Sequence, residues 1–238
     1  MPTRLPPPEP AAAPRRRRKE ARPQELLQAA LELFVEKGFA AARSEEVAAR
    51  AGVSKGTLYR YFPSKAELFK AVVRQNLSAL IAEGQQLADR FDGPSDELLR
   101  RLLRAWWLRV GSTAAGGIFK IIVAEVRNFP ELAQFYADEV QVPADRLIAG
   151  TLQRAIRRGE FRAVPVAEAT LALIAPMLFL ALHRHSVGAC PAAAKGMDAL
   201  AVLETHLALV LDGLRAAPAR AGAVRTRAPG PRTPARIA

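Results

Sequence analysis

The sequence predicts an all-α fold, with a small N-terminal head of three helices and a larger helical body. Near the start, Leu27, Ala30, Leu31 and Phe34 recur at i, i+3, i+4 and i+7, the spacing of one apolar helix face. The next stretch has the spacing of two short helices around a glycine turn. The rest of the chain is a series of apolar helical segments separated by glycine and proline.

The first helix of the head is expected to begin near Pro23, which suits a first-turn position, and to end at Gly38. The following stretch, EEVAARAGVSKGTLYRYFPSKAE, is a helix-turn-helix pattern. Within it Gly52 supplies the positive φ of a sharp turn, and Ser54 is a good N-cap for the second helix. A proline ends that helix, because it pushes Phe62 out of the α region.

The outward side of this second helix suits DNA recognition. Lysine and arginine can hold phosphates or guanine edges, a threonine methyl suits a thymine methyl, and tyrosine hydroxyls reach phosphates. Alone, Tyr59 or Tyr61 would be a packing residue and Lys55 a solvated charge, so the joint pattern carries the prediction. The predicted DNA-binding residues are Arg43, Ser54, Lys55, Gly56, Thr57, Tyr59, Arg60, Tyr61 and Lys65.

A possible phosphate clamp follows directly. Ser64 and Glu67 are spaced as an S-x-x-E capping box. Lys65 lies at the positive end of the helix that begins there, where anions bind readily. This helix is expected to continue to about Arg90 and to link the head with the body.

The stretch from Pro23 to Val73, above all AGVSKGTLYRYFPSKAELF, resembles the N-terminal DNA-binding domain of the TetR family of bacterial transcriptional regulators. The family usually has a capping threonine and an apolar residue where this chain has Ala42 and Ser44. Arg43 lies where the family often touches phosphate. A weaker resemblance, in FPELAQFY and RGEF, extends into the body.

The resemblance implies a DNA-binding domain at 23–70 and an effector-binding and dimerisation domain at 71–215. It also implies a homodimer on a palindromic double-stranded DNA operator, with a small-molecule effector. We therefore expect a ligand-responsive repressor in the cytoplasm, associated with the nucleoid when it binds DNA.

The net charge of +12 lies mainly in the two ends of the chain. Residues 1–22 hold seven basic and two acidic residues, and residues 216–238 hold five basic and none acidic. Both ends are rich in proline and alanine, so we expect a disordered basic arm and a disordered basic tail. The arm could lie along the DNA backbone or in the minor groove, or it could be a solvated tail that raises affinity non-specifically.

In the body, two apolar segments near the C-terminus, Val166–His185 and Asp198–Arg215, match the pair of helices through which the family dimerises. Alternatively, they only close the core of the monomer. The first is expected to be interrupted at Pro176 and is too short and too closely flanked by charge for a convincing membrane span. A turn at Asp92-Gly93-Pro94 precedes a helix that Ser95 is expected to cap. The next helix is expected over Ile118–Phe129, and Pro143 is expected to kink a later one.

Aromatic and apolar residues of the body are expected to be mainly core, but some can line an effector cavity. The candidates are Trp106, Trp107, Phe119, Phe135, Met177 and His183.

No phosphate-binding loop, zinc spacing or nucleophile elbow is present, so neither a cofactor nor a metal is predicted. His183 and His185, with the single Cys190, do not form a convincing metal site. One cysteine and no apolar leader fit a reduced compartment and a soluble protein. Two alternatives remain: a non-specific DNA-coating protein driven by its basic ends, and an enzyme on a helical body, which lacks any assembled acid, base or nucleophile.

Overall fold

The computed structural model describes residues 15–190 and 197–216, and these are entirely helical apart from turns and one isolated bridge between Phe161 and Arg215. The predicted all-α fold is confirmed. The predictions for residues 1–14 and 217–238 lie outside the described residues. The α-helices are α1 (Arg15–Lys37), α2 (Ser44–Arg50), α3 (Lys55–Tyr61), α4 (Lys65–Val73), α5 (Ala79–Arg90), α6 (Ser95–Trp106), α7 (Gly117–Glu125), α8 (Pro130–Tyr136), α9 (Val142–Arg157), α10 (Val166–Arg184) and α11 (Ala199–Leu214).

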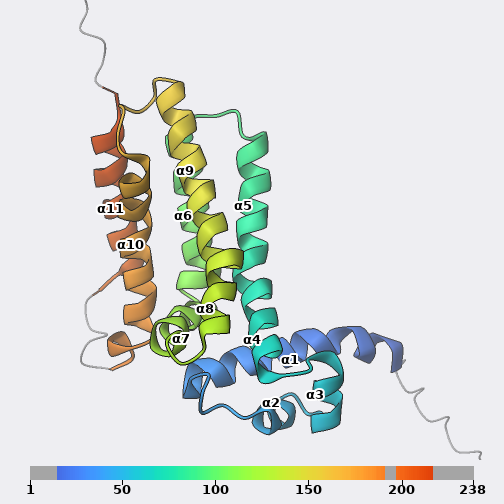
Figure 1. Cartoon of the computed structure of the whole chain (residues 1–238). Helices are drawn as coiled ribbons and strands as arrows, with labels where there is room; N and C mark the ends of the chain where they lie inside the picture. The colour runs from blue at the N-terminus through green and yellow to red at the C-terminus, as the bar shows by residue number, and fades with distance from the viewer. Residues whose placement is uncertain (1–14, 191–196, 217–238) are drawn as a thin grey trace, which may run out of the picture.

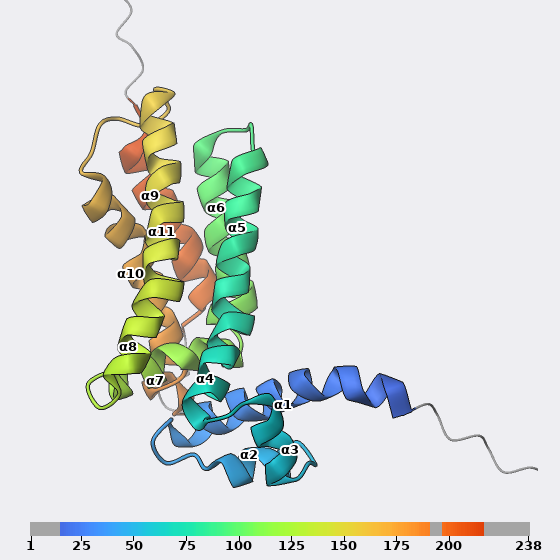
Figure 2. The same cartoon turned by 45° about the vertical axis from the view of Figure 1, so that its right-hand side comes forward.

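The head forms the base of the molecule and the body rises from it as a bundle of long helices (Figure 1). Helix α1 lies across the base, with α2 and α3 on its outer side. After a turn of the view, α4 is seen to leave the head and continue into α5 (Figure 2). Helices α7 and α8 lie at the junction between head and body. The head is therefore attached to the body both through the chain and through packing.

Helix α1 begins at Arg15, eight residues before the predicted start near Pro23. Residues 15–22, which were predicted as part of the disordered arm, lie in this helix. Arginine, lysine, glutamate and alanine, which make up this run, are all good helix formers. The prediction weighed only their lack of apolar surface. Pro23 lies inside the helix, where its ring removes one backbone hydrogen bond.

The head core is a cluster of phenylalanine rings that continues into the body. The ring centroid of Phe34 is 5.7 Å from that of Phe39 and 5.5 Å from that of Phe69. Phe129, which precedes α8, meets the Phe39 ring edge-on at 4.8 Å. Leu58 of α3 is 1% exposed in the same cluster. One continuous core therefore holds the second helix of the motif, α1 and the lower part of the body.

Residues 65–90 form one continuous helical rod, as predicted, but with a π-helical turn at Arg74–Ser78 between α4 and α5. Two further π turns follow along the chain, Trp107–Gly111 after α6 and Ala137–Gln141 between α8 and α9. The guanidinium of Arg74 donates to both carboxylate oxygens of Glu139, at 2.7 and 2.6 Å. The π turns at 74–78 and 137–141 are thus joined by a bidentate ion pair.

Pro143 follows the π turn at 137–141 and lies four residues after Glu139, whose backbone carbonyl contacts Ser78. Proline has no N–H to donate to the carbonyl four residues before it, which belongs to Glu139. That carbonyl instead accepts a hydrogen bond from the Ser78 hydroxyl, at 3.2 Å. A π turn thus lies directly before Pro143, where a kink was predicted, and the Glu139 carbonyl bonds the linking rod.

Three predicted details of the body differ from the structure. Pro94 occupies the N-cap of α6, and Ser95 instead donates its backbone N–H to Glu160 at 2.8 Å. Helix α7 ends at Glu125, earlier than expected. Helix α10 runs through Pro176 without interruption.

By length and composition, α10 is the one helix among the described residues that could cross a membrane. In the structure it packs against α7, α9 and α11, and it contributes Leu173, Met177 and Leu180 to the core. In the structure 28% of its most apolar window is buried.

Candidate nucleic-acid interface

The local chemistry of the turn sets the start of α3. Gly52 has φ 66°, the left-handed conformation that the turn requires. Ser54 is the N-cap, and its hydroxyl accepts a hydrogen bond from the backbone N–H of Thr57 at 3.1 Å. The two side-chain hydroxyls of these residues also lie 2.9 Å apart. Both predicted features of the turn are confirmed.

The outer side of α3 is exposed along its length. Ser54, Lys55, Gly56, Tyr59 and Arg60 are all exposed. A Cβ added to Gly56 would meet only the Ser54 hydroxyl, at 3.9 Å, so the backbone there is open to a close approach. These predicted DNA-binding residues therefore share one exposed surface, the predicted reading face.

Two of the predicted DNA-binding residues, Tyr61 and Thr57, are less exposed than the others on α3. Tyr61 packs partly against the head core, and the Arg60 guanidinium lies 5.4 Å above its ring. Thr57 is half-buried beside the cap. Both residues support the helix, and at most part of each side chain reaches its outer surface.

Lys65 does not offer the free ammonium that a phosphate clamp needs. Its Nζ donates to the carbonyl oxygens of Phe39, Ala40 and Ala42 at 2.8, 3.0 and 3.1 Å. An ammonium has three N–H donors, so all are used. Burial lowers the pKa of Lys65, and the Glu125 carboxylate acts against that shift. In this structure Lys65 closes the loop between α1 and α2, and its contact with phosphate stays a prediction.

The N-caps of α2 and α4 lie next to this loop. Ser44 is buried and is the first residue of α2, so Arg43 is the N-cap. The Glu46 carboxylate accepts from the Arg43 backbone N–H at 3.1 Å, which leaves the Arg43 side chain exposed. At α4, Ser64 accepts from the Glu67 N–H at 3.1 Å, but the Glu67 carboxylate pairs with Lys70. The S-x-x-E box is therefore only half formed.

An acidic residue that the sequence analysis missed lies on the reading face. The carboxylate of Glu45, in the first turn of α2, is 2.5 Å from the ammonium of Lys55. This hydrogen bond lowers the pKa of Glu45 and raises the pKa of Lys55. The available signal was the position of Glu45 directly after Arg43 and Ser44, at the start of the motif.

The predicted effector residues are divided between two core clusters. Trp106 packs its ring 6.5 Å from Trp107 and 5.5 Å from Phe119, so these three form one aromatic wall. Phe135 belongs to the same core cluster as Phe119 and lies beneath the Arg74 guanidinium at 4.9 Å. Met177 belongs to the same core cluster as Trp107. His183 is half-buried on α10, near the Phe179 ring.

The aromatic wall continues to a residue that was not predicted. The Tyr136 ring meets Phe119 edge-on at 6.4 Å. Burial raises the pKa of Tyr136, and the negative charge of Asp145 adds to the shift. Burial also raises the pKa of Asp145. Polar groups at the end of an apolar wall are typical of ligand sites.

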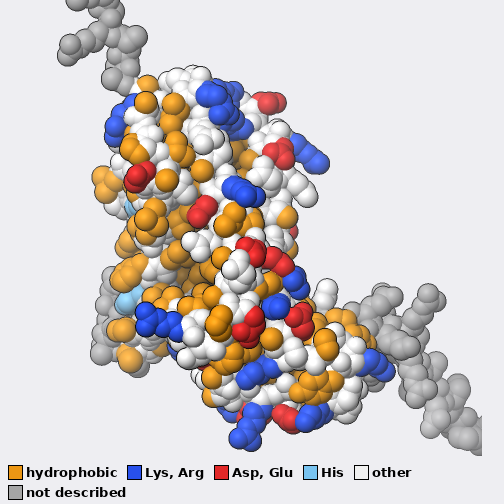
Figure 3. Space-filling model, viewed as in Figure 1, with side chains coloured by type: hydrophobic (Ala, Val, Ile, Leu, Met, Phe, Trp, Pro, Cys, Tyr) orange, Lys and Arg blue, Asp and Glu red, His pale blue; other side chains and the backbone are white. Residues whose placement is uncertain are grey.

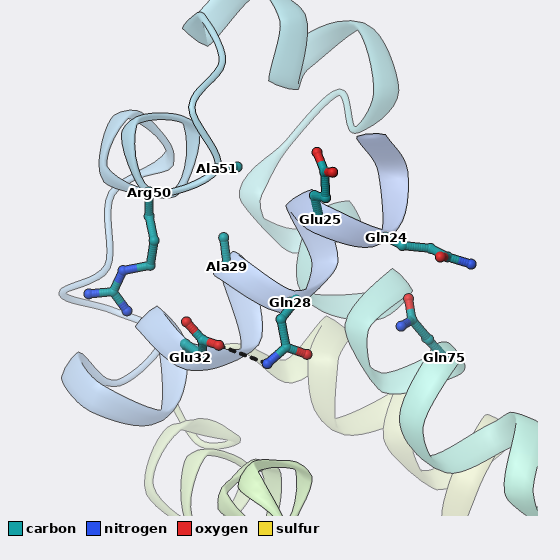
Figure 4. Close-up of a pocket in the computed structure, with 8 residues that line it drawn as sticks. All are labelled: Gln24, Glu25, Gln28, Ala29, Glu32, Arg50, Ala51 and Gln75. Carbon is teal, nitrogen blue, oxygen red and sulfur yellow. Dashed lines mark hydrogen bonds between the residues drawn. The ribbon is translucent and has the colours of Figure 1, made fainter. Parts of the chain in front are cut away.

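A groove of about 680 Å³ lies in the head, between α1, the end of α2 and the first π turn (Figure 4). It is open and polar, and Gln28 donates to Glu32 across its floor at 2.8 Å. None of the predicted effector residues lines it. Its lining residues are Gln24, Glu25, Gln28, Ala29, Glu32, Arg50, Ala51 and Gln75.

The outer faces of α10 and α11 are apolar and exposed. Leu171 and Phe179 of α10 are 65% and 61% exposed, and Leu209 of α11 is 71% exposed. Hydrophobic side chains cover this side of the body (Figure 3). A groove of about 330 Å³ runs between the two helices beside Leu209.

Comparison with known proteins gives two family matches. Residues 26–72 match the bacterial regulatory proteins of the tetR family, and residues 92–201 match the tetracyclin repressor-like C-terminal domain. These matches cover the head and most of the body.

Individual relatives agree with these matches. The chain is 30% identical to the transcriptional regulator YfiR of Bacillus subtilis, over 61% of this chain and 71% of that protein. It is 26% identical to the transcriptional repressor KstR2 of Mycolicibacterium smegmatis, over 82% and 91% of the two chains. The transcriptional activator FasR of the same organism is 39% identical over 89 residues, which are 37% of this chain and 40% of FasR.

The fold also matches a solved structure. The TetR family transcriptional regulator PfmR from Thermus thermophilus superposes with a TM-score of 0.64 and 25% identity, over 80% of this chain and 98% of PfmR. The helix-turn-helix geometry, the all-α body and the family matches lead to the same conclusion. The chain belongs to the TetR family of bacterial DNA-binding transcriptional regulators.

Proposed function

We propose that this protein is a ligand-responsive repressor that binds a palindromic operator as a homodimer. The observation that carries the proposal is the exposed outer side of α3, held by the Ser54 cap and by a core that continues into the body. The proposed domains are the head at 23–70 and the body at 71–215. Localisation in the cytoplasm follows from this function.

In the proposed complex, the two α3 helices of a dimer enter successive major grooves, about 34 Å apart on one face of the duplex. Lys55, Tyr59 and Arg60 are the exposed side chains that would reach bases and phosphates. The exposed Arg43 would add a backbone contact. Ser54 and Thr57 would hold the helix at the angle that these contacts need.

The proposed dimer forms through α10 and α11. Their exposed leucine and phenylalanine side chains would pack against the same side chains of a second copy, as a two-fold axis requires. Two helices from each chain would make a four-helix bundle. A surface of this apolar character is typical of an interaction site.

The proposed effector is a small molecule that enters beside the aromatic wall of Trp106, Trp107 and Phe119. The wall lies between the upper core and the helices that contact the head, so a ligand there would be placed between the two. Such a ligand shifts the protein between two states only by its difference in affinity for them. In the state with lower DNA affinity, the rods of residues 65–90 would separate the two heads differently.

A repressor is proposed because the repressor KstR2 is similar over most of both chains. The activator FasR matches over a shorter part, and its similarity therefore bears less on the body.

Genomic selection tests the function. Purified protein is incubated at about 150 mM salt with sheared DNA of its source organism, since this salt suppresses purely electrostatic binding. Enriched palindromes are expected, and Tyr59→Ala should weaken their binding while Lys55→Ala should also change sequence preference. If both variants bind the enriched DNA like the wild type, α3 is not the reading helix.

The alternative is a non-specific DNA-coating protein, which the charge of the two chain ends favours. Deleting residues 1–22 and 216–238, which carry most of the excess charge, distinguishes the two functions. A regulator keeps its sequence preference after the deletion, whereas a coating protein loses nearly all binding.

A further inference from the structure

Glu45 places a negative charge on the surface that is proposed to face DNA. Its side chain is 53% exposed and that of Lys55 is 56% exposed, and the two charged groups are 2.5 Å apart. Acidic and basic side chains lie close together on this lower face of the head (Figure 3). A carboxylate facing the phosphates of a duplex is repelled, so its presence there needs an explanation.

The neighbouring acidic residue is used differently. The Glu46 carboxylate bonds Lys37 at 2.7 Å and the Arg43 backbone N–H at 3.1 Å. It therefore holds α2 against α1. Glu45 contacts the first residue of α3 instead, and Lys55 also lies 5.7 Å above the Tyr59 ring. The Glu45 carboxylate thus belongs to the reading face.

A donor and an acceptor that lie side by side match the edge of one base pair. In the major groove, guanine offers the acceptors N7 and O6, and its cytosine partner offers the N4 amino donor. Lysine is suited to the guanine acceptors, and glutamate accepts from cytosine N4. The N-terminal residues of a recognition helix are those that contact base edges, and Lys55 is the first residue of α3.

We propose that Glu45 and Lys55 act as one specificity-determining unit that reads a C·G base pair in each half-site. The ammonium of Lys55 donates to guanine, and the carboxylate of Glu45 accepts from the amino group of the paired cytosine. The inference rests on the proposed function, because it requires α3 to lie in the major groove.

The same pair lowers binding to other sequences. Off the operator, Lys55 remains neutralised by Glu45 and adds little to the release of counterions from phosphates. If Lys55 moved to a phosphate, the Glu45 carboxylate would lose its hydrogen-bond donor while it faced the negative charges of the DNA backbone. Selectivity therefore comes both from the contact with the correct base pair and from repulsion at the others.

The test uses the full-length protein and random duplexes for in vitro selection, for the wild type, Glu45→Ala and Lys55→Ala. The control variant is Glu36→Ala, which removes a similar exposed pair with Arg50 in the head, at 2.7 Å. Thermal melting first establishes that each variant is folded. The selected duplex and an unselected duplex are then titrated by fluorescence anisotropy from about 50 to 300 mM salt.

We expect the wild type to enrich a palindrome with one C·G pair per half-site at which Glu45→Ala and Lys55→Ala each lose preference. On the unselected duplex, Glu45→Ala should bind more tightly than the wild type. Its plot of log binding constant against log salt concentration should be steeper by about 0.9, because the freed Lys55 neutralises one more phosphate. The affinity ratio of selected to unselected duplex should fall roughly 5- to 100-fold. The double variant Glu45→Ala/Lys55→Ala should lose little more of this affinity ratio than either single variant. Glu36→Ala should behave like the wild type.

Two outcomes overturn the inference while the proposed function stands: unchanged base preference and salt slope in Glu45→Ala, or loss of preference at an A·T pair instead. If a folded Glu45→Ala variant binds neither duplex, Glu45 supports affinity and the inference is also wrong. If the wild type itself enriches no motif, the proposed function fails and the inference fails with it.

Discussion

The carboxylate of Glu125, at the end of α7, accepts a hydrogen bond from the backbone N–H of Ala40 at 3.0 Å. Ala40 lies in the loop between α1 and α2, whose carbonyl groups bond Lys65. A body helix and a head helix therefore hold the same loop from two sides. Because this loop leads directly into α2, its position affects the motif that α3 completes.

Glu125→Ala should loosen this loop. We expect amide hydrogen exchange at Ala40 to accelerate and the free energy of unfolding to fall by roughly 0.5–1.5 kcal/mol, the contribution of one hydrogen bond. Exchange measured by NMR and urea unfolding check the two effects. Arg127→Ala, two residues further on and exposed, is the control and should change neither. Unaltered exchange at Ala40 would mean that Glu125 does not hold the loop.

Lys65→Met should act on stability before it acts on DNA binding. The variant keeps much of the side-chain length but leaves three carbonyl groups without their donor, so we expect a loss of roughly 1–3 kcal/mol in the free energy of unfolding. Urea unfolding measures the loss. A variant of unchanged stability that binds DNA weakly would instead support the predicted contact of Lys65 with phosphate.

Gly117→Ala should strain the junction of head and body. A Cβ at Gly117 would lie 2.6 Å from both terminal methyl groups of Val35 on α1. Overpacking of this kind costs about 1–3 kcal/mol. Val35→Ala opens the space, so the double variant should be less destabilised than the sum of the two single variants. Additive losses would show that α1 and α7 do not press together at this point.

Leu209→Glu should weaken the proposed dimer without unfolding the monomer. Leu209 is 71% exposed, and a two-fold interface would bury one new carboxylate from each copy. We expect a dimer dissociation constant raised by roughly 100-fold or more, measured by analytical ultracentrifugation. Val123→Glu changes a side chain that is 68% exposed on α7, and it should leave the dimer intact. Equal behaviour of both variants would remove α11 from the interface.

Stability should fall on mild acidification through His185. Its Nε2 lies 2.9 Å from the carbonyl oxygen of Thr113, and burial lowers its pKa below the ordinary value of 6.5. The unfolded chain therefore takes up the proton first, so this contribution to stability is present above about pH 6.5 and is lost as the pH falls through the folded pKa. Urea unfolding between pH 5 and 8 should show a weaker pH dependence in His185→Asn. An identical dependence in the variant would assign it to other groups.

The sequence predicted those features that depend on a residue's own chemistry. Gly38 and Gly52 have the positive φ values expected of a helix end and of a turn. Ser54 caps α3 through its own hydroxyl. The apolar spacing along α1 likewise predicted a helix, because periodicity is local.

The sequence could not predict which partners distant residues choose. The partners of Lys65 lie 23 to 26 positions away, and Ala40 is 85 positions from Glu125. A lysine at a helix start suits phosphate and carbonyl groups equally well, so only the folded chain distinguishes them. The same holds for Glu45, whose role became visible once its contact with Lys55 was known.

The π turn between α4 and α5 has a geometric consequence for the linking rod. One extra residue in a helical turn shifts the direction of all later side chains by about 100°. Helix α4 points Leu68 and Val72 into the head core, and α5 brings Gly84 to within contact of Leu102 and Leu147 in the body. The π turn thus changes the helical register, so that one rod packs against the head core on one side and against the body core on another. A conformational change that converted this π turn into regular α-helix would rotate the head relative to the body without bending the rod.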